Sequence, residues 1–116
     1  MEKRVELTLL MDFYGPLLTE HRREILALYC EEDMSFQEIA DQLGISRQGV
    51  HESVKAAAAQ LNRYEAALGL ADRYRRIVRE VKTCRSLLES VQASEGTRSA
   101  LRGALEALDR INGIER

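Results

Sequence analysis

The stretch from Met34 to Lys55, MSFQEIADQLGISRQGVHESVK, constrains the fold of this chain more than any other. Ser35 suits the position just before a helix, and Glu38, three residues later, completes a Ser-x-x-Glu capping box. Apolar residues then recur at helical spacing, at Phe36, Ile39, Ala40 and Leu43. The pattern predicts a short amphipathic helix that begins directly after Ser35.

A tight turn and a second helix follow in the same stretch. Gly44 can adopt the left-handed backbone that ends a helix, and Ile45 is the apolar residue of the turn. Ser46 suits the cap of the next helix, whose buried side we expect at Val50 and Val54. Two short helices joined by such a turn form a helix-turn-helix, whose second helix enters the major groove of DNA.

Helical patterns also precede and follow this motif. A first helix is expected to end before Gly15-Pro16, because proline disfavours helix in the residue before it. A second is expected from Glu20 to Cys30, capped by Thr19. The chain has one proline and no tryptophan, and no segment alternates as a strand would. These features predict an all-α protein.

After the motif, apolar residues recur alternately every three and four positions. This spacing describes a heptad seam on one long helix, through Ala67, Leu70, Tyr74, Ile77, Val81, Cys84, Leu88 and Val91. The helix packs either against its own domain or against a partner, most simply a second copy of the chain. A short last helix is expected at 98–111, ended by Asn112-Gly113. We therefore predict a helix-turn-helix domain at 1–67 and a helical, dimerising extension at 68–116.

The charge of the chain is unusual for a protein that binds nucleic acid. The net charge is −2, whereas strong DNA binders are usually basic. Residues 1–33 hold four Lys and Arg against eight Asp and Glu, while residues 68–92 hold six against three. That surplus comes from Arg73, Arg75, Arg76, Arg79, Lys82 and Arg85. A lone domain is therefore expected to bind duplex DNA weakly at physiological salt.

If the motif reads nucleic acid, its contacts come from the start and the exposed side of the second helix. Arg47 can bind guanine or phosphate, Gln48 can pair with adenine, and Lys55 can reach a phosphate. The full candidate set is Ser46, Arg47, Gln48, His51, Glu52 and Lys55. Glu52 opposes the two cations, and the same residues also suit an ordinary solvated helix face.

No residue pattern points to catalysis, to a cofactor or to a metal ion. The only histidines, His21 and His51, belong to no arrangement with a nucleophile, and neither a P-loop nor a GxGxxG is present. Cys30 and Cys84 are far apart and form no CxxC, so we expect free thiols in a reducing compartment. With no signal peptide and no membrane-spanning apolar run, the expected location is the cytoplasm, without a membrane partner.

Several motifs of residues 1 to about 90 stand together in a combination that is typical of one family. They are Asp12-Phe13-Tyr14-Gly15, Leu17-Leu18-Thr19, Leu28-Tyr29, Ser35 to Ala40, and Ile45-Ser46-Arg47-Gln48-Gly49-Val50. The segment resembles the YlxM family of small bacterial helix-turn-helix proteins. Its motif also looks like region 4 of bacterial sigma factors. The chain departs from the family at Gly49, where alanine is usual, and at His51, where an aromatic residue such as tyrosine is common.

The resemblance implies an all-helical bundle related to sigma region 4. The long helix and the short C-terminal helix that follow are expected from the apolar pattern, and the resemblance does not cover residues beyond about 92. It also implies a regulatory link to the signal recognition particle, with that particle's RNA or GTPase subunit as partner. Three hypotheses follow: a non-enzymatic accessory factor of protein targeting, a dimeric DNA-binding transcription regulator, or a protein-interaction module that has lost nucleic-acid binding. The acidic charge favours the first and third, whereas Arg47 and Gln48 favour the second.

Overall fold

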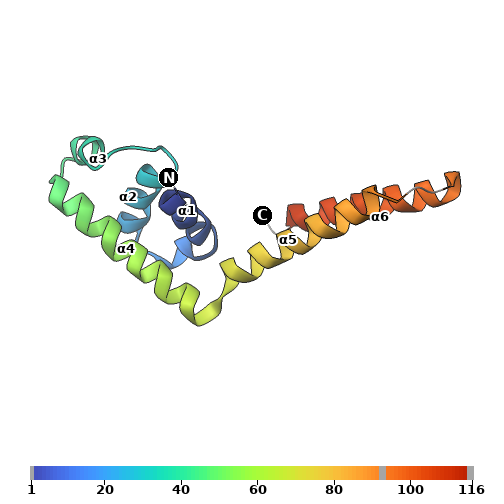
Figure 1. Ribbon diagram of the computed structural model, residues 1–116. Coiled ribbons are helices and arrows are strands. Elements are labelled where there is room, and N and C mark those ends of the chain that lie inside the picture. The colour runs from blue at the N-terminus through green and yellow to red at the C-terminus, as the bar shows by residue number, and fades with distance from the viewer. Residues whose placement is uncertain (1, 92–93, 115–116) are drawn as a thin grey trace. The chain divides into compact units, whose positions relative to one another are not determined.

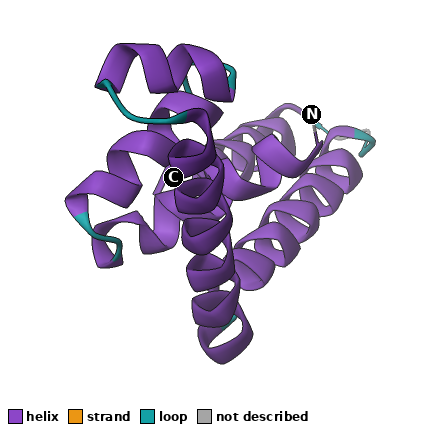
Figure 2. Ribbon diagram, turned by 90° about the vertical axis from the view of Figure 1, so that its left-hand side faces the viewer, coloured by secondary structure: helices purple, strands orange, loops and turns teal. Residues whose placement is uncertain are grey.

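Capping residues divide the first part of the chain into short helices (Figure 1). The computed structural model describes residues 2–91 and 94–114. Its elements are α1 (Glu2–Tyr14), the 3-10 helix η1 (Gly15–Leu17), α2 (Glu20–Cys30), α3 (Phe36–Leu43), α4 (Arg47–Leu68), α5 (Leu70–Glu89) and α6 (Glu95–Ile114). No strand occurs in the described ranges, so the predicted all-α class is confirmed (Figure 2).

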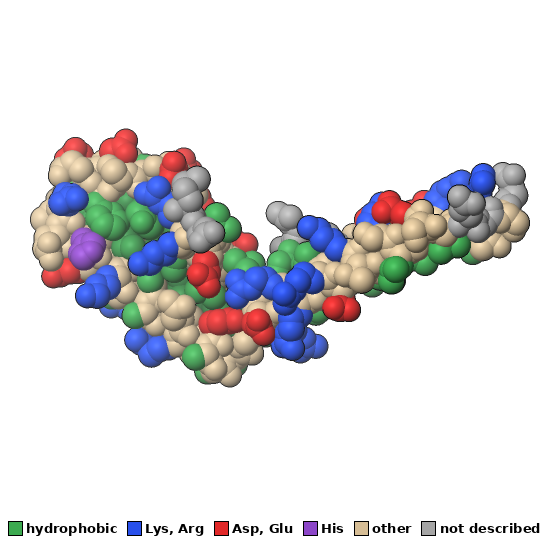
Figure 3. Space-filling model, viewed as in Figure 1, with side chains coloured by type: hydrophobic (Ala, Val, Ile, Leu, Met, Phe, Trp, Pro, Cys, Tyr) green, Lys and Arg blue, Asp and Glu red, His purple; other side chains and the backbone are tan. Residues whose placement is uncertain are grey.

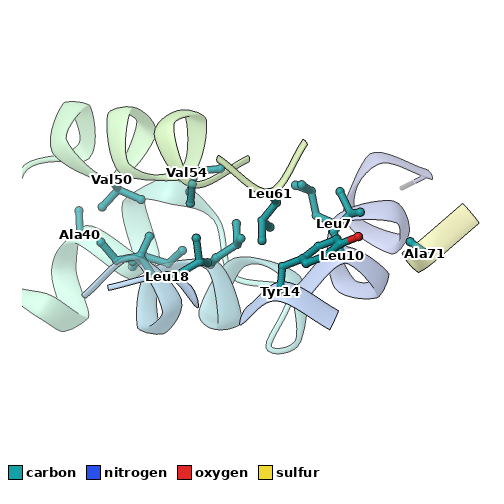
Figure 4. Packing of buried hydrophobic residues seen from close by; sticks show 13 residues of the cluster. Leu7, Leu10, Tyr14, Leu18, Ala40, Val50, Val54, Leu61 and Ala71 are labelled. Atoms are coloured by element: carbon teal, nitrogen blue, oxygen red, sulfur yellow. The ribbon is translucent and has the colours of Figure 1, made fainter. Parts of the chain in front are cut away.

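The chain divides into two compact units, Met1–Ala71 and Asp72–Arg116. In the first unit α4 packs against each of α1, α2 and α3, which explains its central place in the core. Thirteen hydrophobic side chains are buried there: Leu7, Leu10, Tyr14, Leu18, Ile25, Leu26, Ile39, Ala40, Val50, Val54, Ala57, Leu61 and Ala71 (Figure 4). The inward direction predicted for Val50 and Val54 is confirmed.

A buried tyrosine ties the ends of the first unit together. Tyr14 is only 1% exposed, and its hydroxyl donates a 2.7 Å hydrogen bond to Oε1 of Glu65. The same hydroxyl accepts a 3.0 Å bond from the backbone N–H of Leu70, and Glu65 Oε1 accepts one from the N–H of Ala71. These bonds satisfy N–H groups that the start of a helix leaves unpaired. They explain why Leu70 and Ala71, the first two residues of α5, belong to the first unit.

Gly69 separates α4 from α5. Its φ of 65° lies in the left-handed region, and its N–H donates to the carbonyl of Glu65 at 2.8 Å. The expected single helix from Ala67 to Val91 is therefore wrong at both ends: Ala67 lies on α4, and Val91 lies beyond the end of α5. Because the left-handed Gly69 interrupts the regular helix, Ala67 and Leu70 do not lie on the same face of one continuous helix.

The second unit consists of the rest of α5 and of α6, which returns beside it (Figure 1). Arg85 joins the two helices through a 2.6 Å ion pair with Asp109. None of the described side chains from Asp72 onward is fully buried, and the apolar stripe is half-covered at Tyr74, Ile77, Val81, Leu88, Leu101, Ala104, Leu105 and Leu108. The seam is thus partly shielded by the chain's own last helix.

The last helix is longer than predicted at both ends. It begins at Glu95 rather than near Arg98, because the N–H of Arg98 donates to the carbonyl of Ser94 at 2.8 Å and closes a first turn. It also continues through Asn112-Gly113 to Ile114, so the expected stop at this dipeptide is wrong. Glycine permits a helix end but does not impose one.

Candidate nucleic-acid interface

The first helix of the motif begins and ends at the predicted residues, and the second begins after Ser46, as predicted. The Ser35 side chain accepts a 3.1 Å bond from the N–H of Glu38, whose carboxylate accepts a 2.9 Å bond from the N–H of Ser35. Hydrogen bonding to Ser35 lowers the pKa of the Glu38 carboxyl, and the bond from the backbone N–H of Ser35 has the largest effect. Gly44 adopts a φ of 70°, and both its N–H and that of Ile45 donate to the carbonyl of Ala40. The end of α3 is therefore fixed by two hydrogen bonds to one carbonyl.

The side chain of Ser46 caps the start of α4. Its hydroxyl accepts a 2.9 Å bond from the N–H of Gly49, which makes it the N-cap of α4. Of the two roles considered for Ser46, capping is the one seen in the structure. A Cβ at Gly49 would lie 3.1 Å from that hydroxyl oxygen, so the absent side chain leaves room for the cap.

The other candidate contact residues all lie exposed on α4. Arg47, Gln48, His51, Glu52 and Lys55 are exposed, at positions that repeat over successive turns of one helix. The amide of Gln48 donates a 3.3 Å bond to the carboxylate of Glu52, so these two side chains are engaged with each other. Among the described residues, neither Arg47 nor Lys55 takes part in an ion pair. Both charges are therefore presented to solvent.

An apolar cleft of about 290 Å³ adjoins this face, between α1, α2, α3 and α4. Three aromatic rings form part of its wall: Tyr29 and Phe36 have centroids 5.2 Å apart, and Phe36 meets His51 edge-on at 5.4 Å. It is lined by Lys3, Leu7, Tyr29, Phe36, His51, Val54, Lys55 and Ala58. Figure 3 shows hydrophobic surface on this unit, with a histidine and basic side chains around it.

The sequence prediction missed most of this cleft. His51 and Lys55 were candidates, but Tyr29 was named only in a family motif, Phe36 only in the apolar face of a helix, and Lys3 not at all. The guanidinium of Arg4 lies 4.2 Å from the centre of the Tyr29 ring and pairs with Asp33, which fixes this aromatic wall. Aromatic residues at the end of α2 and the start of α3 were the available signal.

The basic residues of α5 lie in the second unit. Arg76 pairs with Asp72 at 3.3 Å, and Arg85 pairs with Glu89 at 3.6 Å as well as with Asp109. Such exposed pairs contribute little stability, about 0–1 kcal/mol each. Within the described parts of the chain, no ion pair engages Arg73, Arg75, Arg79 or Lys82.

Among the residues that the structure describes, no group of three or more His, Cys, Asp and Glu side chains is arranged to hold a metal ion. No helix in the described ranges is both long and apolar enough to cross a membrane. The thiol of Cys30 is half-buried, and burial raises its pKa, whereas Cys84 is exposed.

The fold and the capped motif define a helix-turn-helix protein. Residues 1–100 match the family UPF0122, described as "Putative helix-turn-helix protein, YlxM / p13 like". The chain belongs to this family, as the resemblance predicted.

Relatives from several bacteria are similar over most of the chain. A UPF0122 protein of Symbiobacterium thermophilum is 42% identical over 102 residues, which cover 88% of this chain and 91% of that protein. One from Desulforamulus reducens is 36% identical over 114 residues, covering 98% of this chain and 91% of that protein. One from Acetivibrio thermocellus is 50% identical over 74 residues, covering 64% and 63%.

Proposed function

We propose that this protein is a non-enzymatic regulatory factor that binds nucleic acid through α4 and acts in the signal recognition particle pathway. The observation that carries the proposal is the exposed face of a capped α4, on which Arg47, His51 and Lys55 recur at helical spacing. The assignment to protein targeting rests on the resemblance to the YlxM family, with the particle's RNA or GTPase subunit as partner. The cytoplasm is the proposed location, because that particle works there.

The charge of this face limits the affinity of a single domain. Each phosphate neutralised contributes a slope of about −0.9 to log K against log salt, so Arg47 and Lys55 together supply a slope of about −2. Two copies would double that slope. Weak electrostatic binding by one domain favours a structured RNA or a ribonucleoprotein, which can supply contacts beyond phosphate.

The test titrates the full chain against the particle's RNA, the reconstituted particle and random duplex DNA over a range of salt concentrations. We expect tighter binding to the RNA or the particle than to the duplex. Arg47→Gln should reduce the salt slope by about one, and Arg23→Gln, on exposed α2 surface, should leave it unchanged. Equal affinity for all three ligands would refute the assignment to the particle.

A second candidate is a dimeric DNA-binding transcription regulator. It is favoured by Arg47 and Gln48, which stand in the first turn of α4, where such helices contact base edges. A duplex sequence bound far more tightly than random DNA, and more tightly than the particle, would support this candidate over the first.

Homodimerisation is part of both proposals, and we place it on the α5–α6 hairpin. A groove of about 680 Å³ opens there, with Ile77, Val81 and Ile111 among its lining residues. Ile111 is 43% exposed and Leu87 64% exposed, so two helices alone leave apolar area open to water. A second hairpin would cover it, as in a four-helix bundle.

Light scattering at tens of micromolar tests this interface. Replacing Ile77 and Val81 by lysine should split the dimer while the first unit stays folded, because no buried core residue of that unit is changed. A wild-type monomer at these concentrations would refute dimerisation. Global unfolding of the variant would instead mean that the seam is closed within one chain.

A further inference from the structure

We infer that the aromatic cleft beside α4 binds one unpaired nucleobase of the nucleic acid that this helix contacts. The inference rests on the proposed function, since it assigns a ligand to the same face. The cleft joins the aromatic side chains of Tyr29, Phe36 and His51 to the ammonium groups of Lys3 and Lys55. A nucleotide offers the matching parts, a flat aromatic base and flanking phosphates.

The size of the cleft fits a single ring system. Its volume of about 290 Å³ lies just below the roughly 300–1,000 Å³ that is usual for small-molecule sites. Leu7 and Val54 are buried and form an apolar floor, which repels a phosphate but accepts a base. An extended peptide segment would need a longer groove than these eight lining residues provide.

The aromatic wall has the composition that proteins use to hold bases. Unpaired bases stack on Phe, Tyr and His rings, and this contact tolerates every base because each has a π face. Phe36 and Tyr29 are half-buried, so their rings are held in place yet partly reachable from outside. Arg4 stacks on Tyr29 and further restricts that ring.

The position of the cleft joins it to the proposed contact face. His51 and Lys55 lie one turn apart on α4 and belong to both surfaces. A strand that runs along the exposed side of α4 would therefore pass the mouth of the cleft. The cations at its rim favour an anionic ligand over an apolar protein surface.

The experiment uses the full chain and a hairpin that carries one 2-aminopurine, either bulged or paired in the same stem. Both forms are made as RNA and as DNA, so that the source of the base is distinguished. The chain has no tryptophan, so the emission of 2-aminopurine is read without that background. We expect the bulged form to bind roughly tenfold more tightly than the paired form, with quenching as the base stacks.

Substitutions of residues that line the cleft test whether the base binds there. His51→Ala and Phe36→Leu should abolish most of the preference for the bulge, His51→Tyr should keep it, and Arg23→Gln should bind as the wild type does. His51 is exposed and lies outside the buried core, so its variants remain informative if Phe36→Leu is destabilised. Lys55→Gln should weaken both forms alike and reduce the salt slope by about one.

The outcomes separate the inference from the proposed function. Equal affinity for bulged and paired stems would overturn the inference while nucleic-acid binding stands. A preference for the bulge that survives both His51→Ala and Phe36→Leu would also overturn it, and would leave the cleft to a protein contact. Failure to bind any of the four hairpins, with the particle's RNA also unbound, would refute nucleic-acid binding itself.

Discussion

Replacing Tyr14 by phenylalanine tests the hydrogen-bond network that closes the first unit. The ring stays, so the packing against Phe13 and Tyr64 is preserved and only the hydroxyl is lost. Two bonds disappear with it, one donated to Glu65 at 2.7 Å and one accepted from the N–H of Leu70 at 3.0 Å. The N–H of Leu70 then needs a new partner in a partly buried place, while Oε1 of Glu65 loses one of its bonds and keeps the one from the N–H of Ala71.

The cost follows from those two groups. An unsatisfied buried donor or acceptor costs about 1–3 kcal/mol, and bonds to charged groups lie toward the upper end. Because water can reach part of the site, we expect a loss of about 2 kcal/mol in the free energy of unfolding. With a urea m-value of about 2 kcal/mol/M, the unfolding midpoint should fall by about 1 M.

Urea unfolding followed by circular dichroism measures this loss, with Tyr64→Phe as the matched control. The Tyr64 hydroxyl accepts a 2.9 Å bond from the half-buried Gln60 amide, so its removal should cost only about 0.5 kcal/mol. A loss below 0.5 kcal/mol for Tyr14→Phe, or one equal to the control, would refute the reasoning.

The pH dependence of the same pair gives an independent check. Burial, and then the bond to Glu65, raise the pKa of Tyr14 above its usual value of 10.0. The folded state therefore keeps this proton longer than the unfolded state does. The contribution of the Tyr14 proton to the stability of the folded protein is complete below pH 10. It is lost as the pH rises through the raised pKa of Tyr14. Tyr14→Phe should lack this alkaline loss.

Three further perturbations test other parts of the chain. Ser35→Ala should lower stability by about 1 kcal/mol in urea, because the bond that the serine hydroxyl accepts from the N–H of Glu38 is lost. The pKa of Glu38 is lowered chiefly by the backbone N–H of residue 35, which alanine keeps, so both proteins should lose the stabilisation from that bond as the pH falls below 4.5. Gly44→Ala should cost about 1 kcal/mol by thermal or urea unfolding, from its φ of 70° alone, because no atom lies within 4 Å of the added Cβ. A thiol reagent at neutral pH should label Cys84 faster than Cys30, and dilution should speed the labelling of Cys84 if the seam is an interface between copies.

The fold could be predicted where local chemistry decides it. Ser35, Gly44 and Ser46 act through bonds to residues three or four positions away, and Thr19 likewise accepts from the N–H of Arg22. Such caps are readable from the sequence because both partners stand in one short window. The family motifs then extended this reading to the whole first unit.

Contacts between distant residues could not be predicted in the same way. Tyr14 and Glu65 are 51 positions apart, and no spacing rule pairs them. The heptad pattern predicted an apolar seam on α5. It could not tell whether the chain's own α6 or a second copy covers that seam, since either could pack an apolar face against it. The candidate site could be predicted only in part. The pattern of α4 indicated Arg47 and Lys55, whereas Lys3 and Tyr29 reach the cleft only through tertiary packing.

The Tyr14 network also sets an order for completing the protein as it is synthesised. The ribosome adds residues from the N-terminus, so Tyr14 is made well before Glu65, Leu70 and Ala71. Until Ala71 has emerged, the hydroxyl and carboxylate at this junction lack the backbone donors that hold them. The first unit is therefore finished only after the chain has passed Gly69 and begun its next helix. A chain that ends at Leu68 would contain α1 to α4 but lack the N–H donors of Leu70 and Ala71 that complete this junction.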